Sequence, residues 1–130
     1  YRCGTGHSVS FVGNVHEGPH SLNGRNQVVF EPGMVITDEP GVYEGGRLGI
    51  RIENELECLH KETNQYGRFL CFEPLTWVPI ATSPIVPGVL TKDQLDWLNA
   101  YHRRVFEQLA PRLNDEERDW LARKCAAIGA

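Results

Sequence analysis

Two short stretches decide the fold of this chain, TDEPG at residues 37–41 and GIRIEN at residues 49–54. Between them, VYEGGR at 42–47 has the glycines of a turn. We therefore expect neighbouring antiparallel strands on which Glu39 and Glu53 can face each other. Upstream, GTGH at 4–7 places His7 in a glycine-rich loop. One histidine and two glutamates that converge on a sheet suit Mn, Fe, Co or Zn, so the pattern predicts a metal site.

The bulk composition excludes several classes of protein. The 130 residues suffice for one domain with its own core. Neither a signal-peptide pattern nor an apolar run of roughly 20 residues is present, so we expect no membrane partner. The net charge of −4 argues against nucleic acid as a partner. The four cysteines form no CxxC pair, which argues against zinc-finger and thioredoxin folds and fits reduced thiols in the cytoplasm.

The sequence changes in character near residue 80. Residues 1–80 are rich in glycine, proline and β-branched residues, and we expect strands at 34–37, 49–59 and 69–80 with a polar hairpin loop at 61–68. Residues 81–130 contain a proline-rich connector, followed by two helices. We assign both parts to one domain of the α+β class, a curved, mainly antiparallel sheet followed by two C-terminal helices.

Each predicted helix begins with a capping box. Thr91 and Asn114 are the expected N-caps, and a glutamine or glutamate follows three residues later. Apolar residues then recur at helical spacing. In the first helix they are Leu95, Leu98, Tyr101, Val105 and Leu109, and in the second Trp120, Leu121 and Ile128. We expect His20, His60 and His102 to face solvent or to pack at edges.

The candidate ligands have structural interpretations as well. His7 and His16 could be surface histidines, Glu39 could simply end a strand, and Glu53 could face solvent. Cys3 has no neighbour that would stabilise a thiolate, which favours an inert thiol. Three ligands of mixed type can hold one ion weakly, whereas two bridged ions need more ligands than this segment offers.

A resemblance to a known family separates these interpretations. The residues that carry it are GTGH at 4–7, NVHEGP at 14–19, EPGVYE at 39–44, GIRIEN at 49–54, FEPLT at 72–76 and WLNAYH at 97–102. In this order they resemble the Xaa-Pro aminopeptidases (aminopeptidase P), metallopeptidases of the pita-bread fold related to prolidase and methionine aminopeptidase. Each motif is weak alone, but their ordered combination is specific. The resemblance implies the C-terminal part of a catalytic domain.

The resemblance also implies an activity and residue roles. The parent enzyme would hydrolyse the N-terminal Xaa-Pro bond of peptides through a hydroxide that bridges two metal ions. His7, Glu39 and Glu53 would be metal ligands, with Glu53 bridging both ions and Glu39 also handling the proton of the attacking water. His16 would contact the substrate and stabilise the transition state.

Three further residues are implied near the same centre. Arg51 would orient the ligands, a role whose loss commonly lowers metal affinity or activity. Tyr43 would line the site. Cys3 stands where the family commonly has a histidine that helps to bind substrate, so its effect on substrate recognition is open.

The implied cofactor is Mn²⁺, two ions per complete site, with Zn²⁺ or Co²⁺ as alternatives. The implied partners are peptides with proline in second position and, for the full-length protein, a second copy in a homodimer. The chain begins at Tyr1 and its only methionine is Met34, so we expect a fragment. Two aspartate ligands of the family would lie upstream, so we expect the fragment to be inactive alone and its site to be empty or partly occupied.

Two other functions stay open at this point. The parent could be a prolidase-type dipeptidase of the same fold. It could also be a catalytically dead relative that acts as a binding or scaffold domain, and Cys3 is the residue that keeps this alternative open.

Overall fold

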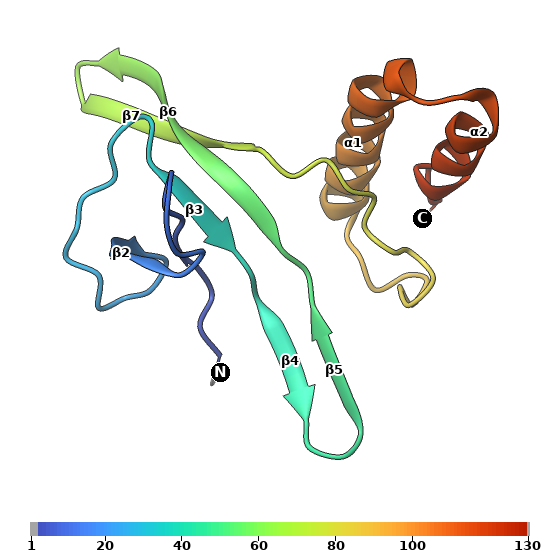
Figure 1. The fold of residues 1–130 in the computed structure, drawn as a ribbon, viewed down its shortest axis with the longest axis horizontal. Helices are drawn as coiled ribbons and strands as arrows, with labels where there is room; N and C mark the ends of the chain where they lie inside the picture. The colour runs from blue at the N-terminus through green and yellow to red at the C-terminus, as the bar shows by residue number, and fades with distance from the viewer. Residues whose placement is uncertain (1–2, 130) are drawn as a thin grey trace. The chain divides into compact units, whose positions relative to one another are not determined.

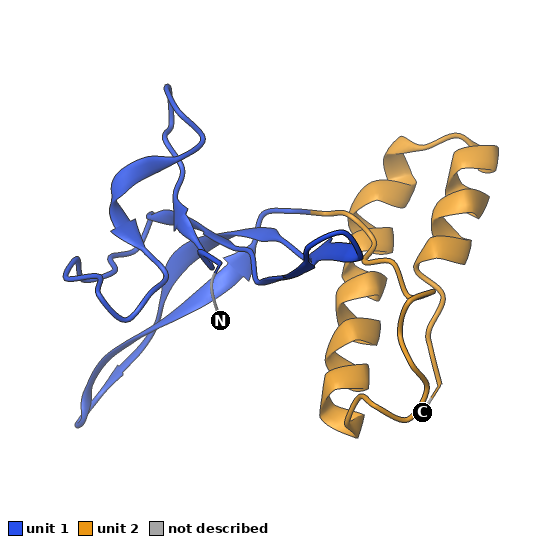
Figure 2. Ribbon diagram, turned by 90° about the horizontal axis from the view of Figure 1, so that it is seen from below, with its two compact units in different colours: residues 1–76 blue, residues 77–130 orange. Residues whose placement is uncertain are grey.

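The computed structural model describes residues 3–129, which form two compact units (Figure 2). Unit 1 comprises residues 1–76 and contains the strands, and unit 2 comprises residues 77–130 and contains the helices. No helix among the described residues is long and apolar enough to cross a membrane. The division at residue 80 into two parts of one catalytic domain stays a prediction.

Unit 1 is built on an antiparallel sheet of five strands in the order β2-β1-β3-β6-β7 (Figure 1). The strands are β1 (His7–Ser8), β2 (Glu17–Ser21), β3 (Val35–Asp38), β6 (Asn54–Asn64) and β7 (Gly67–Pro74). Ile36 and Thr37 of β3 and Cys58 of β6 are almost fully buried. The centre of the sheet is therefore where unit 1 is best packed.

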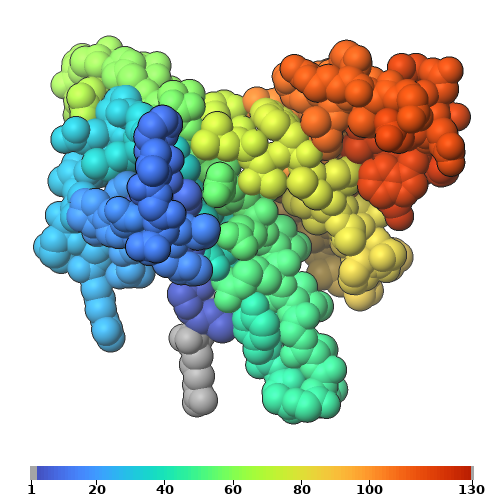
Figure 3. Space-filling model, viewed as in Figure 1, coloured from blue at the N-terminus to red at the C-terminus, as the bar shows by residue number. Residues whose placement is uncertain are grey.

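A separate hairpin continues from this sheet. β4 (Gly41–Glu44) pairs with β5 (Leu48–Arg51) as a two-stranded ribbon, which extends away from the five strands in Figures 1 and 3. The strand expected over 49–59 is therefore broken at residues 52–53, because β5 pairs with β4 whereas β6 pairs with β3. Pro40 lies opposite the break and has no N–H to continue the ladder.

Three expected boundaries in unit 1 are wrong. The turn predicted at 42–47 is confined to residues 45–47, because residues 42–44 belong to β4. The polar loop predicted at 61–68 is mostly strand, since β6 reaches Asn64 and β7 begins at Gly67. These strand ends are exposed on both faces, so their polar side chains are compatible with pairing. The strand expected to reach Ile80 ends at Pro74.

Unit 2 contains the two predicted helices, α1 (Lys92–Leu109) and α2 (Asp115–Lys124), joined by a short 3₁₀ helix (Ala110–Arg112). Both capping boxes are confirmed, with Thr91 and Asn114 as N-caps. The second helix ends before Ile128, which therefore does not lie on its apolar face as predicted.

The core of unit 2 lies between α1 and α2. Tyr101, Val105 and Leu121 are its buried members. Trp120, expected on the apolar face of the second helix, is 51% exposed. His102 is completely buried, so the prediction that it faces solvent or an edge is wrong; a backbone donor from the segment before α1 accounts for its position.

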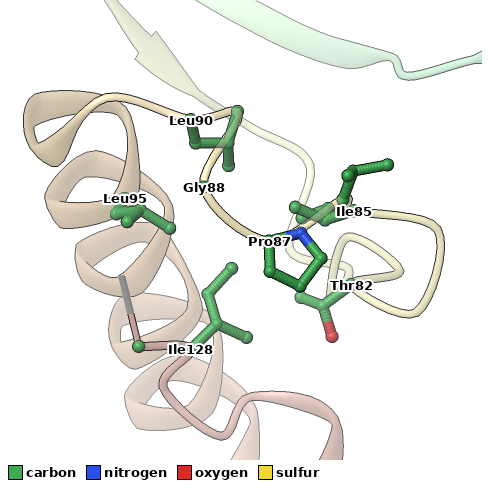
Figure 4. A pocket seen from close by; sticks show the side chains of 9 residues that line it. Thr82, Ile85, Pro87, Gly88, Leu90, Leu95 and Ile128 are labelled. Atoms are coloured by element: carbon green, nitrogen blue, oxygen red, sulfur yellow. The ribbon is translucent and has the colours of Figure 1, made fainter.

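An apolar pocket of unit 2 lies between the connector, the first turn of α1 and the segment after α2 (Figure 4). Ile85, Leu90, Leu95 and Ile128 are among its lining residues, and it encloses about 420 Å³, part of it open to solvent. None of its lining residues is titratable. The described cluster of potential metal ligands lies in unit 1 instead.

Replacing Thr91 with alanine should destabilise unit 2 by about 1 kcal/mol. The Thr91 hydroxyl accepts the N–H of Gln94 at 3.3 Å, and this N–H would lose its partner. The difference is measured by urea unfolding. Thr91→Ser keeps the hydroxyl and should stay close to the wild type; an equal loss in both variants would contradict the role of the cap.

Candidate metal centre

His7 lies on β1, the short strand between β2 and β3. Gly6, just before it, approaches β3 so closely that a Cβ there would lie 2.0 Å from the carbonyl oxygen of Thr37. Only glycine allows the two strands to come this near. The close approach brings His7 beside the end of β3, where Glu39 follows.

Glu39 comes directly after β3, and three side chains fix its carboxylate. Oε1 lies 2.9 Å from Nε2 of His7 and accepts a hydrogen bond of 2.9 Å from the Thr37 hydroxyl. Oε2 lies 2.7 Å from Nη1 of Arg51, which donates to it. The Glu39 side chain is only 13% exposed, so solvent screens these contacts weakly. Both oxygens of the carboxylate are thus fixed in direction.

The contacts of His7 assign its proton. Nδ1 lies 2.9 Å from the carbonyl oxygen of Ser8, and because a carbonyl only accepts, Nδ1 carries a proton. In the neutral ring Nε2 then presents a lone pair, which faces the Glu39 carboxylate. Two acceptors at 2.9 Å require a cation between them or a second proton on His7. The geometry of His7 and Glu39 therefore suits a bound cation.

His16 reaches the same place from the loop between β1 and β2. Its ring stacks on that of His7, with the centroids 4.0 Å apart and the planes 30° apart. Potential ligand atoms of His7, His16 and Glu39 all lie within 4.8 Å of one another. No other group of three His, Cys, Asp or Glu side chains converges in this way within residues 3–129. Two imidazoles and a carboxylate fit a divalent transition metal.

Arg51, the last residue of β5, connects Glu39 to the hairpin. Its Nε donates to the Tyr43 hydroxyl at 2.8 Å, while Nη1 reaches the carbonyl and the carboxylate of Glu39. The hydrogen bond with Tyr43 raises the pKa of Arg51, which is therefore a permanent cation here. A Cβ on Gly41 or Gly49 would lie 2.8 Å from the Tyr43 ring, so the two glycines make room for it.

Glu53 is not part of this group of ligand atoms. It is exposed and lies in the break between β5 and β6. The backbone there runs opposite Pro40, whose carbonyl accepts the N–H of Ile52 at 3.4 Å. The main chain therefore brings Glu53 opposite Glu39, but both residues lie between strands rather than within them. The role of Glu53 as bridging ligand stays a prediction.

Cys3 is a partly buried free thiol. The described part of the chain contains three other free cysteines and no disulfide. The effect of Cys3 on substrate recognition stays a prediction.

Two sequence models of one peptidase family match the chain. The first, described as metallopeptidase family M24, matches residues 1–59, and the second, described as the C-terminal region of peptidase M24, matches residues 68–128. The chain belongs to metallopeptidase family M24. Together the two matches include all six motifs on which the resemblance rests.

Curated relatives of this M24 chain are aminopeptidases. It is 44% identical over 135 residues to Aminopeptidase P1 of Lotus japonicus, covering 99% of the chain and 20% of that protein. It is 40% identical over 136 residues to a Probable Xaa-Pro aminopeptidase P of Coprinopsis cinerea, covering 98% of the chain and 22% of that protein. The chain thus spans about a fifth of the length of these relatives.

A solved structure matches the M24 chain as well. It is the X-prolyl aminopeptidase of Caenorhabditis elegans, described as a cytosolic enzyme with a di-nuclear active site. The TM-score is 0.82 and the identity 39%, over 96% of this chain and 21% of that one. The resemblance to Xaa-Pro aminopeptidases and the fold class, the C-terminal part of a pita-bread fold, are confirmed.

Sequence reasoning missed one residue of the site. Thr37 was assigned only to a strand, yet its hydroxyl contacts both His7 and Glu39. The sequence around Thr37 does not distinguish it from any other β-branched strand residue, because the contact with His7 depends on a segment 30 positions away.

Proposed function

We propose that this chain is the C-terminal part of the catalytic domain of a metal-dependent aminopeptidase that hydrolyses the N-terminal Xaa-Pro bond of peptides. The observation that carries the proposal is the convergence of His7 Nε2 and Glu39 Oε1, an imidazole nitrogen and a carboxylate oxygen 2.9 Å apart. The similarity to aminopeptidases P supports the choice of substrate.

His7, Glu39 and Glu53 are the proposed metal ligands in this chain. The di-nuclear site of the C. elegans enzyme supports two divalent ions, for which we propose Mn²⁺, with Zn²⁺ or Co²⁺ as alternatives. When bound, such ions lower the pKa of a water and polarise the scissile carbonyl. The 130 residues do not include the two aspartates that the resemblance implies, so we propose that they are inactive alone.

We propose that four side chains of this chain take the other roles in catalysis. Glu39 would handle the proton of the attacking water, and the hydrogen bond from Arg51 to Oε2 supports this proposal because it keeps the carboxylate in a fixed orientation. His16 is exposed beside the partly buried His7 and Glu39, and we propose that it donates a hydrogen bond to a peptide carbonyl as negative charge develops there. Tyr43 keeps Arg51 in place through its hydroxyl.

The full-length protein with Mn²⁺ should release the N-terminal residue from Xaa-Pro-Xaa tripeptides. The same tripeptides with alanine in second position are the control and should be cleaved far more slowly. Hydrolysis restricted to Xaa-Pro dipeptides would identify a prolidase-type dipeptidase instead. No hydrolysis by protein whose metal content is verified would favour the binding or scaffold domain.

For the full-length protein we also propose peptides with proline in second position as partners, a homodimeric state and a cytoplasmic location. The first two rest on the resemblance. The third is supported by the description of the C. elegans relative as cytosolic.

A further inference from the structure

One hydroxyl in unit 1 bonds two of the residues that converge at the metal centre, the backbone of His7 and the side chain of Glu39. Thr37 Oγ1 accepts the backbone N–H of His7 at 3.0 Å and donates to Oε1 of Glu39 at 2.9 Å. Thr37 is 1% exposed, so no water competes for these bonds. The two residues it joins are 32 positions apart in the sequence, from His7 to Glu39.

The arrangement of the backbone explains why the N–H of His7 bonds a side chain. Ser8 is the residue of β1 that pairs with β3, opposite Ile36. Main-chain bonds join the two segments on both sides of His7, from Val9 to Val35 and from Glu39 to Thr5, so its N–H lies in an irregular stretch between them. With Gly6 pressed against the carbonyl of Thr37, this N–H meets the Thr37 hydroxyl instead of a main-chain oxygen. A hydrogen bond that a strand would normally make through its backbone is here made through a side chain.

The direction of the two bonds is fixed by the hydroxyl itself. A hydroxyl has one proton, and since the His7 N–H already donates to Oγ1, that proton goes to Glu39. Oε1 therefore accepts a hydrogen bond from the Thr37 hydroxyl on one side and faces Nε2 of His7 on another. Any rotation of the Glu39 carboxylate would break the bond to Thr37.

We propose that Thr37 is a positioning residue that holds His7 and Glu39 in register for the metal. The inference rests on the proposed function for the identity of the bound group. Arg51 fixes Oε2 from the hairpin, and Thr37 fixes Oε1 from the sheet. Without the Thr37 hydroxyl, Oε1 of Glu39 loses the hydrogen bond that fixes its position, while Oε2 stays bonded to Arg51.

The test compares Thr37→Val with Thr37→Ser in the full-length protein. Valine has nearly the same shape without the hydroxyl, and serine keeps the hydroxyl without the methyl group. Mn²⁺ affinity is measured by titration calorimetry, and kcat and KM with a tripeptide at saturating Mn²⁺. We expect valine to weaken Mn²⁺ binding roughly 10- to 100-fold, and serine to retain most of the wild-type affinity. KM should change much less than kcat in the valine variant.

Unchanged Mn²⁺ affinity in a folded valine variant would overturn the proposal, and so would equal losses in both variants. If the valine variant does not fold, Thr37→Ala against Thr37→Ser repeats the contrast without the γ-methyl. The metal titration keeps the two proposals separable. A protein that binds Mn²⁺ in a Thr37-dependent way but cleaves no Xaa-Pro peptide would refute the function and leave the role of Thr37 standing.

Discussion

Glutamine in place of Glu39 should lower kcat/KM of the full-length protein for an Xaa-Pro-Xaa peptide by about 10³-fold. The substitution keeps the shape of the side chain but removes the charge that faces Nε2 of His7 and Nη1 of Arg51. It also puts an amide NH₂, which cannot accept a proton or bind a metal, in place of one carboxylate oxygen. Both metal binding and proton transfer would therefore be impaired.

The loss is measured by steady-state kinetics at saturating Mn²⁺, with the metal content of each protein determined. Glu44→Gln is a matched control, because Glu44 lies on the neighbouring β4–β5 hairpin, forms an ion pair with Arg47 and has a side chain that is 47% exposed. That variant should stay within about twofold of the wild type, as expected for an exposed ion pair. A Glu39→Gln enzyme that keeps more than about a tenth of the activity would contradict the role of Glu39.

The approach of His7 to Glu39 could be predicted because both residues sit in motifs with their own turn chemistry. The glycines of GTGH and the proline after Glu39 mark the points where strands end, and ligand residues gather at such ends. The ordered motifs then indicated the family. The helix starts at Thr91 and Asn114 were predictable for a similar reason, since a capping box is a local pattern.

The break at residues 52–53 and the role of Thr37 could not be predicted in the same way. Glu53 and Asn54 interrupt the alternation of apolar residues in this stretch, but only the pairing partners show that it is divided between two sheets. Thr37 reads as an ordinary β-branched strand residue until Gly6 is seen against its carbonyl. Both features depend on contacts distant in sequence, which periodicity does not report.

The burial of His102 in unit 2 also depends on a contact distant in sequence, and it leads to a second prediction. His102 is 0% exposed, and Nε2 accepts the backbone N–H of Ile80 at 3.1 Å. Nε2 can accept only when it carries no proton, so the folded unit requires the neutral ring. The single proton of the neutral ring is then on Nδ1, which has no hydrogen-bond partner among the described residues, and a second proton would have to bind Nε2, against the N–H of Ile80.

Among the described residues, no charged partner offsets the burial of His102. The ring of Tyr101 lies 6.0 Å away, and Cys125 packs on the same core. Burial raises the pKa of Tyr101 and of Cys125, so both are neutral near pH 7. Arg104, with its guanidinium 5.2 Å from the Trp77 ring, is itself a cation. Burial accordingly lowers the pKa of His102 below its ordinary value of 6.5.

The sign of the pH dependence follows from this lowered pKa. Below about pH 6.5 the unfolded chain binds a proton at His102 that the folded unit does not bind. Stability is therefore fully present above pH 6.5 and should fall as the pH drops through the lowered pKa of the folded state. The chain's three tryptophans, at 77, 97 and 120, all lie in unit 2, so urea unfolding followed by fluorescence reports on this unit.

His102→Leu should cost about 1–3 kcal/mol at pH 8, because the buried N–H of Ile80 loses its acceptor. The same variant should lose much of the wild type's decline in stability between pH 7.5 and pH 5, since leucine does not titrate. His60→Leu is the control, an exposed histidine of unit 1 whose loss should leave the fluorescence transition unchanged. If His102→Leu and the wild type decline equally toward pH 5, another group carries the pH dependence and the buried neutral ring does not.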